Sequence, residues 1–594
     1  MEDKTMRMMI ARYCGICALA LALPALLLAQ DEVVQKNRLV IEGGTLIDGT
    51  GGAPLRDSVL VIEGNRIAAV GPRGQVQLPQ EAEVIDASGK FILPGFSDIH
   101  VHWDFWMPEL FLAHGVTSAV DLDSFVPWIM EEKDALRDGR MRGPRLFTTT
   151  SSLSGRLIWD SPESPARIRR LASPEMARRL TRAVGPGREQ YNLTKTYTEI
   201  SPDQLQAVVE ESHRAGRNVM AHLGSLDARQ AARLGVDGIA HGSGIALATI
   251  SDPARAAELR SFTRLGIAVD YPLFLMYHAY MDMTRVDDLV NLLVESDVGI
   301  EFEQVNTAGR WVPENQKAWL AEDTRLLEDP DLHYIPQENR DRVLYYEPYQ
   351  QLTEVQRERV GQGYEKRKEF IGRFARAGGK VLAGCDTASF VLPGICLHRE
   401  LELLVEAGLT PMQAIQAATK NNFEFLQEDD LGTLQAGKLA DLIILGEDPL
   451  TDIRNTRSVQ TVIQNGRVID SGYHADFVNP VPKPAASAGF VNPKPFIRVI
   501  YPMSSSEPNK ELTLIIEGSN LVDESVVEFD GERVPGTPVV STMRRETVYN
   551  PVYSQLEVTI PARLLDRYGS YRVIVRNPRP QGGVSNALTF FVAQ

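Results

Sequence analysis

Apolar runs of strand length alternate with helix-like segments through the middle of the chain, and this alternation most limits how it can fold. Eight candidate strands lie near residues 92–102, 116–122, 144–150, 191–197, 217–222, 236–241, 266–272 and 380–386. Repeated strand and helix units favour parallel pairing, and eight of them suit a closed (β/α)8 barrel. We therefore predict an α/β fold with a TIM barrel at 92–426. Because structureless loops of such length are rare, the long stretch at about 300–375 predicts a helical insertion over the barrel mouth.

Short strands with glycine and asparagine turns flank this central region on both sides. Such turns and branched apolar residues favour antiparallel sheets. We expect residues 37–91 and 427–475 to pair into one composite β-sandwich, which makes that domain discontinuous. A proline-rich linker follows at 476–496, and alternating strands with regular turns predict a second β-sandwich at 497–594.

The first thirty residues have the order of a secretory signal. Lys4, Arg7 and Arg12 precede an apolar run from Cys14 to Leu28, and Ala29 marks the expected cleavage site. The alternative is an uncleaved anchor, but the apolar run is short for a span of about 20 residues. We expect residues 1–29 to be removed and the protein to be secreted or periplasmic, with no membrane contact afterwards.

The net charge and the number of cysteines limit which binding partners and which stabilising cross-links the chain can have. The chain has 594 residues, a formal net charge of −16 and a pI near 5.3, which argues against nucleic acid as a partner. Of its four cysteines, two leave with the signal, so a disulfide scaffold is excluded. The sequence leaves open whether Cys385 and Cys396 form a disulfide.

Histidines and other polar residues gather at the ends of the predicted barrel strands. His100 and His102 end the first strand and, with Asp98, alternate onto one face. Lys195, His222, His241 and Asp386 end the fourth, fifth, sixth and eighth strands. An isolated His-x-His is as often structural as metal-binding, but the carboxyl ends of barrel strands are where such enzymes place their active sites. Together these residues predict a metal site.

At this point the sequence resembles the amidohydrolase superfamily, in particular its imidazolonepropionase-like and Xaa-Pro dipeptidase-like members. The resemblance covers about residues 37–472. It rests on Leu93-Pro94-Gly95 before His100-Val101-His102, on the strand-end residues above, and on the closing run from Gly432 to Leu442.

The resemblance implies a set of residue roles. His100, His102 and Asp386 would bind one divalent ion, and His222 and His241 a second. A carboxylated Lys195 would bridge the two ions. The metal would be zinc, with manganese, iron or cobalt as alternatives.

Further roles follow from position and chemistry. Asp386 would act as general base and acid. Asp98 is expected to orient a histidine from behind rather than to bind metal. Tyr277 and His278 are candidate substrate contacts. The glutamate that single-metal deaminases of this superfamily carry after the fifth-strand histidine is missing, since Leu223-Gly224-Ser225 follows His222, so deamination is disfavoured.

The sequence thus predicts an exported metal-dependent hydrolase that cleaves a C–N bond in an amide, a dipeptide or a cyclic amide. One alternative is cleavage of an ester, lactone or phosphotriester at the same centre. Another is a catalytically silent binding protein. It would act through residues 497–594, which resemble the TIG/IPT immunoglobulin-like fold and are either a passive spacer or a protein-binding or carbohydrate-binding module.

Overall fold

The computed structural model describes residues 38–124, 126–149, 152–155, 168–183, 191–264, 271–307, 309–344, 353–387, 391–482, 495–519, 521, 525–534, 539–543, 553–577 and 583–592. The predicted signal segment at 1–29 and most of the proline-rich part of the linker lie outside these residues. Within them, no helix combines the length and the hydropathy needed to cross a bilayer.

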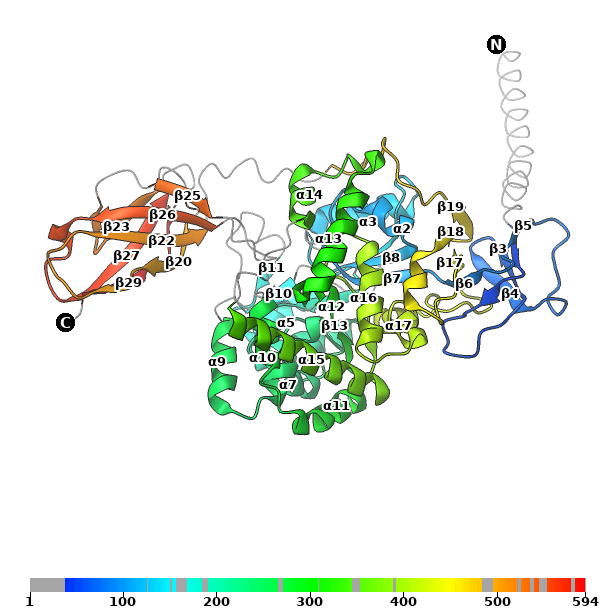
Figure 1. Ribbon diagram of the computed structural model, residues 1–594, viewed down its shortest axis with the longest axis horizontal. Coiled ribbons are helices and arrows are strands. Elements are labelled where there is room, and N and C mark those ends of the chain that lie inside the picture. The colour runs from blue at the N-terminus through cyan, green and yellow to red at the C-terminus, as the bar shows by residue number, and fades with distance from the viewer. Residues whose placement is uncertain are drawn as a thin grey trace, which may run out of the picture.

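Parallel strands form the centre of the molecule, flanked by helices (Figure 1). The first sheet runs β7(Phe96–Val101), β8(Val116–Asp121) and β9(Arg145–Thr148). The second runs in the order β11(Ile168–Arg170), β10(Ser152–Ser154), β12(Leu193–Thr196), β13(Asn218–Ala221), β14(Gly238–Ile239), β15(Gly299–Glu301) and β16(Val381–Leu382). All neighbours in both sheets are parallel.

The two sheets meet at both edges through isolated parallel bridges. Thr149 pairs with Leu193 on one side, and Val101 pairs with Thr387 on the other. The predicted mixed α/β fold is therefore confirmed. A continuously paired, closed barrel is not seen among the described residues, because single bridges replace ladders at these two seams.

Burial and capping explain why these residues form these elements. Every residue of β7 and β8 is buried, as expected for strands covered on both faces. The helices α6(Pro202–Arg214) and α7(Ala228–Arg233) begin at capping boxes, where Ser201 and Asp227 accept from the third helical amide. Other helices of the first half are α2(Pro108–Ala113), α3(Val126–Arg137), α5(Pro174–Ala183), η1(Ala240–Gly242), α8(Ile245–Thr249) and α9(Pro253–Arg264).

The segment predicted as the seventh strand, 266–272, does not hold that place in the sheet, because β15 pairs directly with both β14 and β16. Residues 265–270 lie outside the described part, and α10(Tyr271–His278) begins at the end of the predicted segment. A short apolar run cannot be told from a buried helix by its pattern alone, and Pro272 suits the first turn of a helix. The strand at this place in the sheet is β15, about thirty residues later.

Helices fill most of the stretch between β15 and β16. They begin at residue 304 rather than 300, because residues 299–301 form the strand. They are α12(Gln304–Thr307), η3(Gly309–Trp311), α13(Pro313–Leu327), η4(Pro330–Leu332), α14(Gln337–Leu344) and α15(Glu354–Arg376). Before β15 come η2(Met283–Arg285) and α11(Val286–Glu295), and after β16 come α16(Ile395–Glu406), α17(Pro411–Ala417) and α18(Lys420–Leu426).

Strands from both flanks share one sheet. β6(Phe91–Pro94) pairs antiparallel with β17(Leu442–Leu445), and the sheet continues through β18(Val459–Gln464) and β19(Arg467–Ile469), with β2(Thr45–Leu46) on the other edge. A second sheet holds β1(Arg38–Glu42), β3(Ser58–Glu63), β4(Arg66–Pro72) and β5(Glu83–Asp86). Ile41 and Ile62 share a buried cluster with Leu442 and Ile444, so the flanks form one core.

Only Gly95 separates β6 from β7. A Cβ atom at Gly95 would lie 2.2 Å from Thr117 Oγ1, so no larger residue fits unless Thr117 or the strand moves. The sheet formed by the flanks therefore continues directly into the strand that carries His100.

The C-terminal strands form a separate unit (Figure 1). One sheet has the order β20(Phe496–Tyr501), β22(Leu512–Ser519), β26(Tyr553–Ile560) and β25(Val539–Met543). The other contains β21(Ser504–Ser505), β29(Leu588–Val592), β27(Gly569–Asn577), β23(Val526–Phe529), β24(Glu532–Arg533) and β28(Gly583–Val584), and η7(Ala562–Leu564) precedes β27. Ile516 of one sheet and Phe529 of the other belong to one buried cluster.

A buried ion pair fastens α13 to α16. Arg399 Nη2 lies 2.7 Å from Asp323 Oδ1, and both side chains are fully buried. We predict that Arg399→Met lowers the free energy of unfolding by about 3–5 kcal/mol, because it leaves a buried carboxylate without its cation. Urea unfolding followed by near-UV circular dichroism measures this loss. Arg325→Met, at an exposed site of α13, is the control and is expected to leave the midpoint unchanged; equal midpoints for both variants would contradict the prediction.

Candidate metal centre

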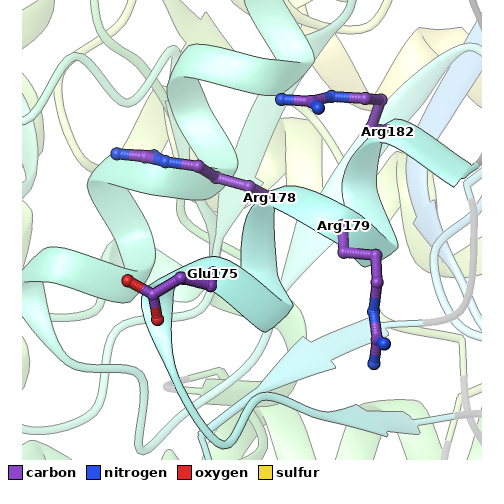
Figure 2. Close-up of a pocket in the computed structure, with 4 residues that line it drawn as sticks. All are labelled: Glu175, Arg178, Arg179 and Arg182. Carbon is purple, nitrogen blue, oxygen red and sulfur yellow. The ribbon is translucent and has the colours of Figure 1, made fainter.

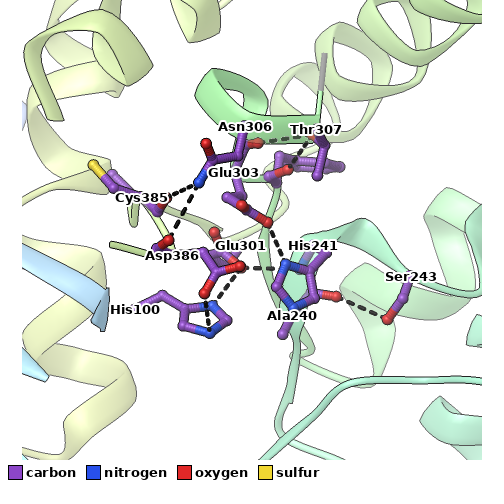
Figure 3. Close-up of polar contacts among 12 residues, drawn as sticks. His100, Ala240, His241, Ser243, Glu301, Glu303, Asn306, Thr307, Cys385 and Asp386 are labelled. Carbon is purple, nitrogen blue, oxygen red and sulfur yellow. Dashed lines mark hydrogen bonds and ion pairs between the residues drawn. The ribbon is translucent and has the colours of Figure 1, made fainter. Parts of the chain in front are cut away.

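The strand ends bring the six predicted ligand residues to one edge of the parallel sheets. His100 lies in β7 and His102 one residue beyond its end. Lys195 lies in β12. His222 directly follows β13, and His241 and Asp386 lie a few residues after β14 and β16. Carboxyl ends of parallel strands lie at one edge, and Figure 3 shows His100, His241 and Asp386 facing one another there.

Distances between these side chains are those of a compact cluster. The ring centroids of His100 and His241 are 4.8 Å apart, and those of His222 and His241 are 4.2 Å apart. His102 Nε2 lies 2.9 Å from Asp386 Oδ1. Lys195 Nζ lies 3.5 Å from His100 Nε2. The structure thus brings all six residues together.

Burial sets the charge state of the histidines and the lysine. It lowers the pKa of His222 to about 3 and holds the pKa values of His100 and His241 well below the usual range. These rings are neutral at pH 7 and keep a lone pair for a cation. Burial also lowers the pKa of Lys195 to about 8, so an appreciable fraction of its amine is uncharged near neutrality.

Asp386 stays ionised in the same environment. Burial alone would raise its pKa, but His100 and His102 outweigh burial and hold the pKa well below its usual range. Its backbone has a φ of 48°, and that of His241 a φ of 60°. Left-handed backbone is uncommon outside glycine and gathers at functional sites.

Asp98 lies behind this cluster. Its Oδ1 accepts hydrogen bonds from the backbone amides of His100 and Cys385, each at 3.1 Å. It thereby ties the strand of His100 to the segment of Asp386 through their backbone amides, and not through an imidazole. Burial raises its pKa to about 7. The two described cysteines, Cys385 and Cys396, are buried and free.

Tyr277 and His278 lie on α10, further from the cluster. His278 Nδ1 donates to the Phe274 carbonyl at 2.8 Å, and its Nε2 lies 3.2 Å from Nη1 of Arg367. Tyr277 packs in an apolar group with Leu247. Arg367 links His278 to the strand end of His241, since it also donates to the His241 carbonyl. A role for Tyr277 or His278 in substrate binding stays a prediction.

Two residues of the site were missed by the sequence reasoning: Glu301 and Glu303, at the end of β15. Glu301 Oε2 lies 3.2 Å from His100 Nδ1, and Glu303 Oε2 contacts His241 Nδ1 (Figure 3). Burial raises the pKa values of both well above the usual range. Their spacing after an apolar run repeats the pattern of His100 and His102, which is the signal in the sequence that could have identified them.

The chemistry of the cluster fits divalent cations. His222 Nδ1 and Glu301 Oε1 are buried and have no hydrogen-bond partner among the residues that the structure describes. Ligand atoms of His100, His241 and Asp386 lie within 4.8 Å of one another, as do those of His241, Glu301 and Glu303. Neutral imidazoles and carboxylates are the ligands that zinc, manganese and iron accept. The donor set leaves the choice among these metals open.

A surface pocket lies elsewhere, on α5. It has a volume of about 410 Å³ and is lined by Glu175, Arg178, Arg179 and Arg182 (Figure 2). Arg178 and Arg182 form ion pairs with Glu210 and Glu211 of α6. None of the strand-end residues lines this pocket, so it is not part of the candidate centre.

Comparison with known proteins finds a family match for one part of the chain and a shared fold for most of it. Residues 354–469 match the Amidohydrolase family. An N-acyl-D-aspartate deacylase of Alcaligenes xylosoxydans xylosoxydans is 37% identical over 95 residues, which are 15% of this chain and 18% of the deacylase. The chain thus matches less than a fifth of that relative's length.

Two solved structures cover most of the chain. A molinate hydrolase aligns with 73% of this chain and 95% of its own, at 21% identity and a TM-score of 0.51. Phenylurea hydrolase B aligns with 75% of this chain and 100% of its own, at 20% identity and a TM-score of 0.51. The family match thus covers residues 354–469 only. At such identities the structures show a shared fold alone.

Metal content tests the assignment of Lys195. We predict that bicarbonate raises the amount of zinc that the metal-free protein takes up, because carboxylation replaces a repelling ammonium with an anionic ligand. Lys195→Ala is expected to bind less zinc than wild type, and to bind the same amount with and without bicarbonate. Elemental analysis after gel filtration measures both.

The control for this test is Lys133→Ala. Burial also lowers the pKa of Lys133 to about 8, but its Nζ lies 3.1 Å from Asn192 Oδ1 and it stands on α3. This variant should respond to bicarbonate like the wild type. If wild type and Lys195→Ala take up equal zinc with and without bicarbonate, the bridging role of Lys195 is wrong.

Proposed function

We propose that the protein is a metal-dependent hydrolase of the amidohydrolase superfamily that cleaves a C–N bond in an amide, a dipeptide or a cyclic amide. The convergence of four histidines, Lys195 and Asp386 at one edge of parallel strands carries this proposal. The match of residues 354–469 to the Amidohydrolase family supports it, as does the deacylase activity named for a relative.

The residues divide into two groups that would hold two cations. His100, His102 and Asp386 would hold the first, His222 and His241 the second, and a carboxylated Lys195 would lie between them. When bound, such ions would supply polarisation of a carbonyl oxygen and a lowered pKa for a bound water molecule. Zinc suits these donors, with manganese, iron or cobalt as alternatives.

Asp386 would move the proton in this reaction. As an ionised carboxylate 2.9 Å from His102, it can accept a proton from the attacking water and deliver it to the leaving amine. Burial of the strand ends strengthens each charge interaction because little water screens it. The chain's own residues therefore supply both a place for the cations and a route for the proton.

The residues around His222 argue against deamination. Leu223, Gly224 and Ser225 follow it, so a serine stands three residues after the histidine. No acidic side chain stands at the position where single-metal deaminases of the resembled family carry a glutamate. Hydrolysis of an ester, lactone or phosphotriester remains the nearest alternative, since activation of water does not fix the leaving group.

Three further proposals complete the assignment. The eight strands β7, β8, β9, β12, β13, β14, β15 and β16 would form the wall of one barrel, closed through the bridges at Thr149 and Val101. Residues 497–594 would form a TIG/IPT-like module that contacts a protein or carbohydrate or serves as a spacer. The charged and apolar pattern of residues 1–29 supports export by a cleaved signal.

A substrate screen tests the proposed function. We expect the zinc-loaded protein to hydrolyse at least one N-acyl amino acid, dipeptide or cyclic amide, and to lose that activity on chelation. Asp386→Asn should lower kcat by 10²-fold or more, because it removes the proton acceptor. Assays of lactones and phosphotriesters in parallel separate the alternative leaving groups.

Asp297→Asn is the matched control. Asp297 also has left-handed backbone, with a φ of 52°, but it is exposed and precedes the amino end of β15. It should retain wild-type activity. A protein that binds fewer than about one divalent ion per chain and hydrolyses nothing would instead favour a binding protein that acts through its C-terminal module. Equal rates for wild type and Asp386→Asn would refute the role of Asp386.

A further inference from the structure

We infer that Glu303 is a positioning residue for the proposed metal ligand His241. This inference rests on the proposed function, because it concerns how the chain prepares that ligand. Glu303 lies two residues beyond β15, in a part of the strand edge to which the family resemblance assigns no role.

The contact between the two side chains fixes the form of the imidazole. Glu303 Oε2 contacts His241 Nδ1 (Figure 3). A neutral imidazole carries one N–H, and a carboxyl oxygen that accepts a hydrogen bond at Nδ1 selects the form with the proton on that nitrogen. Nε2 of His241 then keeps its lone pair for a cation. Carboxylates behind metal-binding histidines orient the ring and raise its basicity in this way.

Glu301 extends the same arrangement to the neighbouring ligand. Its Oε2 lies 3.2 Å from His100 Nδ1 and accepts the backbone N–H of His241 at 2.9 Å. One short strand end therefore contacts two proposed ligands from two other strands. Both carboxylates are fully buried, so no solvent competes for these contacts.

The backbone of both partners is held in place from the inserted helices. Glu303 has a φ of 49°, and His241 has a φ of 60°. Arg367 of α15 donates from Nη2 to the His241 carbonyl at 2.9 Å and to the Phe302 carbonyl at 2.6 Å. This buried guanidinium thus joins the two strand ends on which Glu303 and His241 stand. The helical insertion thereby supports the geometry of the centre.

Metal affinity of three variants tests the inference. The full-length zinc-loaded protein is titrated with a chromophoric chelator, and zinc release is followed at pH 7.5. Glu303→Ala should bind the more weakly held zinc about 10–100-fold less tightly than wild type, the usual loss when such a partner is removed. Glu303→Gln should stay within about 3-fold of wild type, because its amide oxygen still accepts from Nδ1–H.

Glu400→Ala is the matched control. Glu400 is also fully buried, and burial likewise raises its pKa. Its Oε2, however, accepts from the backbone N–H of Val305 at 2.8 Å and from no imidazole of the described residues. It should keep wild-type zinc affinity whatever its effect on the melting temperature. Melting curves of the metal-free proteins show how far each substitution lowers the melting temperature of the fold.

Three results would overturn the inference. Glu303→Ala with wild-type affinity would show that the contact is dispensable. If Glu303→Gln binds zinc as weakly as Glu303→Ala, Glu303 is a direct ligand. If Glu400→Ala binds zinc as weakly as Glu303→Ala, the loss of affinity comes from destabilisation of the fold. A wild type that binds no zinc at all would instead refute the proposed function, so the two failures are distinguishable.

Discussion

The organisation of this protein depends on the burial of many ionisable groups at the carboxyl ends of parallel strands. Four histidines, Lys195, Asp386 and two glutamates are packed there with almost no solvent contact. Burial disfavours charge on each of them, so it pushes imidazoles and lysine toward their neutral forms and carboxylates toward protonation. Such a site is costly to fold without counter-charges, and divalent cations would satisfy the lone pairs that it gathers.

Much of this site could be predicted because strand ends leave a local signal. An apolar run that stops at a histidine or an aspartate is visible in the sequence at His222, His241 and Asp386. The pattern His100-Val101-His102 adds the alternation of a strand. These features require no knowledge of distant contacts, and they placed six residues that the structure brings together.

The sequence did not show what depends on tertiary packing. The predicted strand at 266–272 overlaps the start of α10, a helix that packs against α15, and a short apolar run does not distinguish the two structures. That error hid Glu301 and Glu303, although both follow an apolar run. The support from Arg367 could not be predicted either, because more than sixty residues separate it from the carbonyl groups it contacts.

The single glycine between β6 and β7 has a consequence for the boundaries of the functional unit. β6 pairs with β17 from the far end of the central region, so the strand of His100 is held in register by a chain segment more than three hundred residues away. A fragment cut at residue 92 to isolate the central sheets would release this anchor. The smallest piece that retains the centre therefore includes both flanks, which makes them part of the scaffold of the centre and not an appendage.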